Sequence, residues 1–114
     1  MVLINTVPVR DIRMGLLDFI FGNKAKKIED FVARDAVIVD VRSKGEYASG
    51  AIPGSKNIPL PTISGNVTEI KKWNKPVIVC CASGVRSGSA AAILKSNGIE
   101  AMNGGGWHSL SKKL

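Results

Sequence analysis

The chain alternates short, continuously apolar runs with segments whose apolar residues recur at helical spacing. The runs 36–41 and 76–81 are rich in β-branched residues, which is typical of strands buried on both faces. Residues 56–58 and 99–102 are shorter strand candidates. Helical spacing and capping patterns predict helices that begin at residue 23, at residue 43 (ending near 50), at residue 66, and at residue 87 (ending near 97).

Strands that alternate with helices predict a parallel sheet, because successive parallel strands are joined by crossovers that are usually helical. The expected fold class is therefore α/β, an open parallel sheet in three layers with helices on both faces. Functional sites in such sheets lie beyond the carboxyl ends of the strands. The two buried runs end at Asp40–Arg42 and at Cys81, so a site is expected at one or both of these places.

Size and composition fit one domain preceded by an extension. A chain of 114 residues is too short for two domains, and 45% hydrophobic with 22% charged residues excludes a disordered chain. We assign residues 23–114 to the domain. Residues 1–22 are expected to be an extension, either partly foreign to the natural protein or an extra helix packed on the domain. Their apolar stretch 16–21 is too short to span a membrane, and docking to a partner or a membrane surface is its alternative use.

The charge balance is basic, with 16 Lys and Arg against 9 Asp and Glu and a formal net charge of +7. Such a surplus favours small anions or acidic partners. Nucleic-acid binding is not expected, because the lysines occur as scattered pairs without an aromatic-interleaved stripe.

The only two cysteines, Cys80 and Cys81, are neighbours at the end of a predicted strand. Neighbours in a strand point to opposite faces, and a disulfide between them would be strained. They form neither a disulfide framework nor a metal-binding spacing, so we expect thiol chemistry in a reducing compartment, the cytoplasm, and no metal ion. Cys80 is predicted to point into the core.

Cys81 lies where a strand gives way to a short loop and a helix. Gly84 permits a tight turn, so successive backbone N–H groups can converge on the sulfur, and the following helix adds its positive end. With Arg86 nearby, each factor favours the thiolate, and we predict a nucleophilic cysteine at neutral pH. The predicted binding loop consists of Ala82, Ser83, Gly84, Val85, Arg86 and Ser87.

This loop resembles the active-site loop of rhodanese domains, and further segments from about residue 35 to residue 107 resemble the family in the same order and spacing. One position departs from the family pattern, since many members carry histidine where this chain has Ala51. The resembling segments are Cys81-x-x-Gly84-x-Arg86-Ser87, Val39-Asp-Val-Arg42, Glu46-Tyr47-x-x-Gly50, Ile52-Pro-Gly54-x-x-Asn57-Ile-Pro59 and Gly104-Gly-Gly-Trp107.

The resemblance implies a sulfurtransferase that uses no organic cofactor and no metal. A small anionic donor such as thiosulfate would load sulfur onto Cys81 as a persulfide, and cyanide or a thiol would remove it. The N–H groups of residues 82–87 would hold the outer sulfur and stabilise its charge.

Other polar residues of the resembling segments are expected to support the loop. The resemblance implies that Asp40 and Arg42 brace it, and Glu46 either caps its own helix or pairs with Arg86. His108, the only histidine, has no catalytic motif around it and is expected at the surface.

Two other functions remain open at this stage. A module that carries sulfur to a dedicated protein acceptor would use the same cysteine. Phosphatases that share the rhodanese fold have one more residue between cysteine and arginine, whereas four separate Cys81 from Arg86 here, so a phosphatase is less expected.

Overall fold

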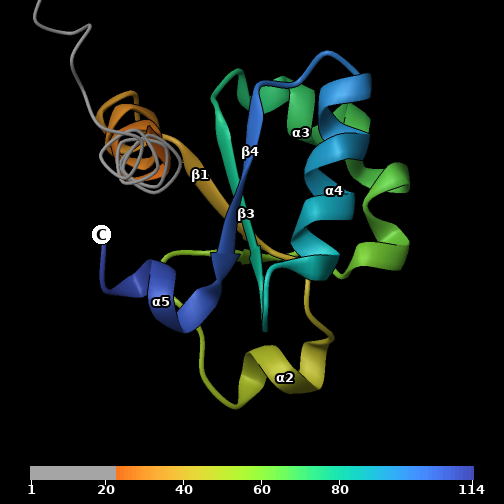
Figure 1. The fold of residues 1–114 in the computed structure, drawn as a ribbon. Coiled ribbons are helices and arrows are strands. Elements are labelled where there is room, and N and C mark those ends of the chain that lie inside the picture. Colours follow the sequence, from red (N-terminus) through yellow and green to blue (C-terminus); the bar gives the residue numbers. More distant parts are fainter. Residues whose placement is uncertain (1–22) are drawn as a thin grey trace, which may run out of the picture.

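The two apolar runs predicted as strands lie side by side at the centre of a four-stranded parallel sheet (Figure 1). The computed structural model describes residues 23–114. The sheet order is β2-β1-β3-β4, and every neighbouring pair is parallel. The strands are β1 (Val37–Asp40), β2 (Lys56–Asn57), β3 (Val77–Cys81) and β4 (Ala101–Gly106).

Helices cover both faces of this sheet (Figure 1). One face is covered by α3 (Val67–Trp73) and α4 (Val85–Ser96), and the other by the helix over residues 23–33 and by α5 (Trp107–Ser111). The predicted three-layer α/β fold is therefore confirmed. Short connections carry α2 (Lys44–Ala48) and two 3-10 turns, η2 (Leu60–Thr62) and η3 (Ser64–Asn66).

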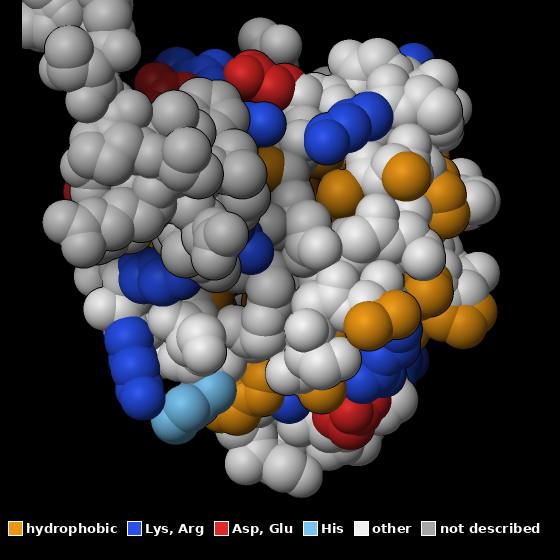
Figure 2. Space-filling model, viewed as in Figure 1, with side chains coloured by type: hydrophobic (Ala, Val, Ile, Leu, Met, Phe, Trp, Pro, Cys, Tyr) orange, Lys and Arg blue, Asp and Glu red, His pale blue; other side chains and the backbone are white. Residues whose placement is uncertain are grey.

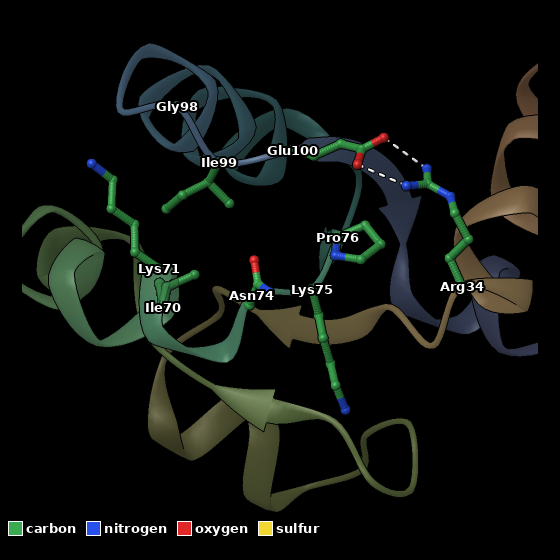
Figure 3. Close-up of a pocket in the computed structure, with 9 residues that line it drawn as sticks. All are labelled: Arg34, Ile70, Lys71, Asn74, Lys75, Pro76, Gly98, Ile99 and Glu100. Carbon is green, nitrogen blue, oxygen red and sulfur yellow. Dashed lines mark hydrogen bonds and ion pairs between the residues drawn. The ribbon is translucent and has the colours of Figure 1, made fainter.

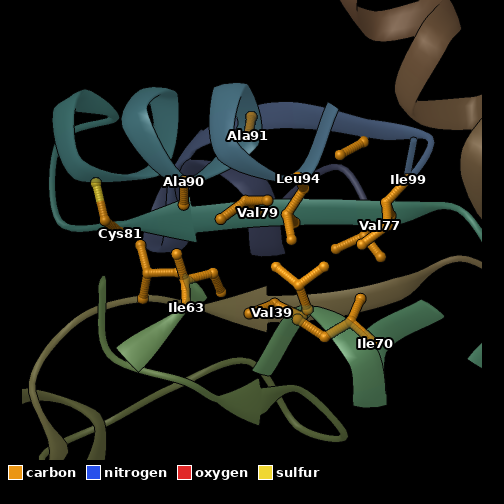
Figure 4. Packing of buried hydrophobic residues seen from close by; sticks show 13 residues of the cluster. Val39, Ile63, Ile70, Val77, Val79, Cys81, Ala90, Ala91, Leu94 and Ile99 are labelled. Atoms are coloured by element: carbon orange, nitrogen blue, oxygen red, sulfur yellow. The ribbon is translucent and has the colours of Figure 1, made fainter. Parts of the chain in front are cut away.

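Strand β3 shows why its sequence is continuously apolar. All five of its residues are buried, and successive side chains enter the cores on opposite sides of the sheet. Val77, Val79 and Cys81 face α3 and α4 in one core (Figure 4). Ile78 and Cys80 face the 23–33 helix and α5 in the other.

The C-terminal strand differs from the prediction. It was expected at 99–102 with the three glycines after it, but β4 runs from Ala101 to Gly106 and contains them. Glycine has a low strand propensity, which hid this part of the strand in the sequence. Packing explains the first glycine, because a Cβ on Gly104 would lie 2.7 Å from Cγ2 of Ile78.

One helix start and one helix cap also differ from the prediction. Helix α4 begins at Val85 rather than at residue 87. Helix α3 follows Asn66 as expected, but the Asn66 side chain does not cap it and instead donates to the carbonyl oxygen of Thr62.

Among residues 23–114, no helix is long and apolar enough to cross a membrane. The expectations for residues 1–22 lie outside the described residues.

Candidate active site

Cys81 is the last residue of β3, and its side chain is fully buried beneath the start of α4. The chain then turns sharply through Gly84, whose φ of +99° suits glycine, and enters α4 directly. A Cβ on Gly84 would also lie 3.3 Å from Cα of Gly105. The predicted cysteine loop is thus a tight turn between the end of a buried strand and the first turn of a helix.

The sulfur of Cys81 accepts hydrogen bonds from the loop that follows it. The N–H of Gly84 lies 3.0 Å from Sγ, and the N–H and the hydroxyl of Ser87 lie 3.4 and 3.3 Å away. Burial raises the pKa of the Cys81 thiol, but these donors, with the N–H of Ser83, outweigh burial and lower the pKa below its ordinary value. The loop therefore favours the thiolate. The sequence pointed to the backbone donors but not to the Ser87 hydroxyl.

Cys80 has the opposite environment. Its side chain is fully buried in the core on the other side of the sheet. Burial, together with the nearby charge of Asp40, raises the pKa of the Cys80 thiol to about 12. Cys80 is therefore a protonated core residue at neutral pH, and Cys81 is the thiol of the pair whose surroundings favour the thiolate.

Arg86 points its guanidinium at the carboxylate of Glu46 rather than at the sulfur. Its two terminal nitrogens lie 2.7 and 3.0 Å from the two oxygens of Glu46. Glu46 also closes a capping box with Ser43 at the start of α2, so this one carboxylate both caps its helix and pairs with Arg86. The hydrogen bond from Arg86, followed by that from the Ser43 backbone, lowers the pKa of Glu46 to about 2. Both alternatives considered for Glu46 therefore hold together.

A buried ion pair lies behind α2. The guanidinium of Arg42 is 2.7 Å from the carboxylate of Asp40, and both side chains are almost completely buried. Arg42 also donates to the carbonyl oxygens of Glu46 and Gly50, at 3.3 and 2.7 Å, and its guanidinium lies 4.7 Å from the ring centroid of Trp107. Asp40 and Arg42 thus hold α2 in place, and α2 in turn presents Glu46 to the cysteine loop.

Residues of the cysteine loop are exposed, whereas the Cys81 side chain itself is fully buried. Ala82 and Ser83 are exposed, and Val85 is 75% exposed.

His108 is exposed on α5, as expected for a surface residue. Lys and Arg side chains appear at separate places on the face seen in Figure 2. Among residues 23–114, no group of three or more His, Cys, Asp or Glu is arranged to hold a metal ion.

A hollow of about 300 Å³ lies at the opposite end of the sheet (Figure 3). It opens beside Pro76, which precedes β3, whereas Cys81 ends that strand. An ion pair between Arg34 and Glu100 closes one side of it, with nitrogen–oxygen distances of 2.8 and 2.7 Å. We place the candidate active site at Cys81, because its surroundings favour the thiolate, whereas the residues that line the hollow include no cysteine.

Comparisons with known proteins identify what this chain is similar to. Residues 24–112 match the family model of the rhodanese-like domain. The chain is 43% identical over 72 residues to the uncharacterized protein YqhL of Bacillus subtilis, which covers 61% of this chain and 56% of that protein. It is 34% identical over 84 residues to the thiosulfate sulfurtransferase GlpE of Pseudoalteromonas translucida, covering 71% of this chain and 79% of that one.

A solved structure is also similar to this chain. The crystal structure of a rhodanese-like domain protein from Staphylococcus aureus is 43% identical, with a TM-score of 0.60. The match covers 66% of this chain and 74% of that one. The chain spans little more than half the length of the Bacillus relative.

Proposed function

Because this chain belongs to the rhodanese-like domain family, we propose that residues 23–114 form a sulfurtransferase domain that moves sulfane sulfur through a persulfide on Cys81. One observation carries the proposal. Cys81 is the last residue of a buried strand, and its sulfur accepts hydrogen bonds from Gly84 and Ser87. A relative named thiosulfate sulfurtransferase supports the same class of reaction. Residues 1–22 remain, in this proposal, an extension of the domain.

The proposed reaction has two displacement steps. In the first, the Cys81 thiolate attacks the sulfane sulfur of thiosulfate, a new S–S bond forms, and sulfite leaves with the electron pair of the broken S–S bond. In the second, cyanide or a thiolate attacks the outer sulfur, and the electron pair of the Cys81 S–S bond returns to Cys81. The products are thiocyanate or a new persulfide. Neither step needs an electron acceptor, a metal or an organic cofactor.

The loop is suited to the charge changes of these steps. The outer sulfur of a persulfide carries the negative charge, and the N–H groups of Gly84 and Ser87 already donate to the sulfur of Cys81. Fixed N–H donors cost little reorganisation when charge moves from one sulfur to the next. Arg86 is proposed to brace the loop, because its guanidinium is already paired with both oxygens of Glu46.

A sulfur carrier for a protein acceptor is the second candidate. Ala82, Ser83 and Val85 are exposed, so a partner protein can contact the loop, although the Cys81 side chain itself is fully buried. The unbridged thiols of Cys80 and Cys81 suit the cytoplasm, where we propose that either activity takes place.

The test is the intact mass of the protein after incubation with thiosulfate. Wild type and Cys80→Ser should each gain one sulfur atom, and Cys81→Ser should gain none. An adduct that depends on Cys80 would contradict the assignment. Transfer from the loaded protein to a protein thiol but not to cyanide would favour the carrier.

A further inference from the structure

The hydroxyl of Ser87 lies between two acceptors, and only one of them is the sulfur. Its oxygen is 3.3 Å from Sγ of Cys81 and 2.7 Å from Oδ1 of Asn103 in β4. A hydroxyl carries one hydrogen, so Ser87 donates to one of these two atoms at a time. The donor that reaches the sulfur is therefore shared with Asn103, a residue that the sequence did not single out.

The amide of Asn103 has one orientation that satisfies its neighbours. Its Nδ2 donates to the carbonyl oxygen of Gly84 at 2.9 Å, and its Oδ1 accepts from the N–H of Gly105 at 2.9 Å. A rotated amide would set donor against donor and acceptor against acceptor. Asn103 thus holds the carbonyl side of Gly84, whose N–H donates to the Cys81 sulfur.

The surrounding backbone is shaped to this side chain. Gly88 in α4 leaves the space that Asn103 occupies, because a Cβ on Gly88 would lie 3.2 Å from Nδ2. The pairing of β3 with β4 slips by one residue after Asn103, which pairs with Val79 while Gly105 pairs with Cys80. A bulge of this kind re-aims backbone groups, and here the N–H of Gly105 meets Oδ1.

We propose that Asn103 is a positioning residue that holds Gly84 in place and competes with the Cys81 sulfur for the hydrogen of the Ser87 hydroxyl. The proposal rests on the persulfide chemistry proposed above. In the free thiolate, the sulfur takes the hydrogen. In the persulfide, the negative charge resides on the outer sulfur, so the hydroxyl returns to Oδ1 of Asn103. Asn103 then stabilises the loop in its loaded state.

Asn103→Asp tests this role, with Asn97→Asp as the matched control. The carboxylate introduced at position 103 would face the Gly84 carbonyl with an acceptor and add negative charge one hydroxyl away from the sulfur. The apparent pKa of Cys81, measured from the pH dependence of its alkylation by iodoacetamide, should rise by about one unit. At a pH below the pKa of Cys81 in both proteins, the variant would then hold about tenfold less thiolate than the wild type. Asn97 donates to the Ile93 carbonyl at 2.8 Å at the other end of α4, so its variant should keep the wild-type midpoint.

The pH profile separates positioning from general damage. A protonated carboxyl at position 103 can donate to the Gly84 carbonyl as the amide does. The ratio of Asn103→Asp to wild-type alkylation should therefore approach one at acid pH and fall as the carboxyl ionises. A ratio that is low and independent of pH would show structural damage alone and would overturn the proposal.

A second variant keeps the proposal testable if Asn103→Asp does not fold. Gly88→Ala favours helix but pushes the Asn103 amide by a few tenths of an ångström, so it should raise the Cys81 midpoint by a smaller amount. Alkylation needs no sulfur donor, so the two proposals fail separately. If the wild type forms no persulfide, the proposed function fails; if it does and these variants react as wild type, the role of Asn103 fails.

Discussion

Replacing Asp40 by asparagine tests the ion pair on which the site is built. The substitution keeps the size of the side chain but leaves the guanidinium of Arg42, which is 4% exposed, without its counter-charge at 2.7 Å. Removing one partner of a buried pair costs about 3–5 kcal/mol. In a domain of this size each kcal/mol lowers Tm by about 4–8 °C, so we expect a fall of at least about 10 °C.

The assay is thermal and urea unfolding at pH 7, with Asp35→Asn as the control. Asp35 forms an equally short ion pair with Lys75, at 2.7 Å, but both side chains are exposed. Its loss should cost no more than about 1 kcal/mol, and asparagine tolerates the φ of +65° at this position. Equal losses in the two variants would refute the view that Asp40 compensates a buried charge.

Four other measurements test the loop itself. The alkylation midpoint of Cys81 should lie below the roughly 8.5 of an ordinary thiol, and a midpoint at or above that value would contradict thiolate stabilisation. Arg86→Lys should lower Tm at pH 7, because lysine cannot bind both oxygens of Glu46. The difference in Tm from wild type should shrink as pH falls from 4.5 toward about 2, where Glu46 protonates. An unchanged Tm at pH 7 would contradict the bracing role of Arg86. The wild type should not hydrolyse aryl phosphates. A glycine inserted between Gly84 and Val85 should reduce sulfur transfer, because it moves N–H groups away from the sulfur. Phosphate hydrolysis that depends on Cys81, without a persulfide, would overturn the proposed sulfurtransferase function.

The sequence was sufficient for the parts of the site that depend on local pattern. The apolar run ending at Cys81, the glycine three residues later and the helix beyond them predict a strand, a turn and a helix in that order. The capping pattern of Ser43 and Glu46 likewise predicts the start of α2, which the structure contains. Each of these features depends on neighbours within a few residues along the chain.

The sequence was insufficient where distant segments meet. Asn103 contacts Gly84 and Ser87, which lie 19 and 16 residues away, and the three glycines after it, with their low strand propensity, hid this part of β4. The choice of Glu46 as the partner of Arg86 depends on a contact across 40 residues, and the sequence left it open. Glycines that packing demands give no signal of their own, so Gly104 and Gly88 were interpretable only in the structure.

The placement of Cys80 and Cys81 on opposite faces of one strand has a consequence for how long sulfur stays bound. In many thiol proteins a second cysteine attacks the first and ends the modified state from within. Here the thiol of Cys80 is buried in the core on the other face of the sheet, and its pKa of about 12 keeps it protonated. If Cys81 carries sulfur as proposed, Cys80 cannot remove it, and the residence time of the sulfur is set by the arrival of a molecule from outside.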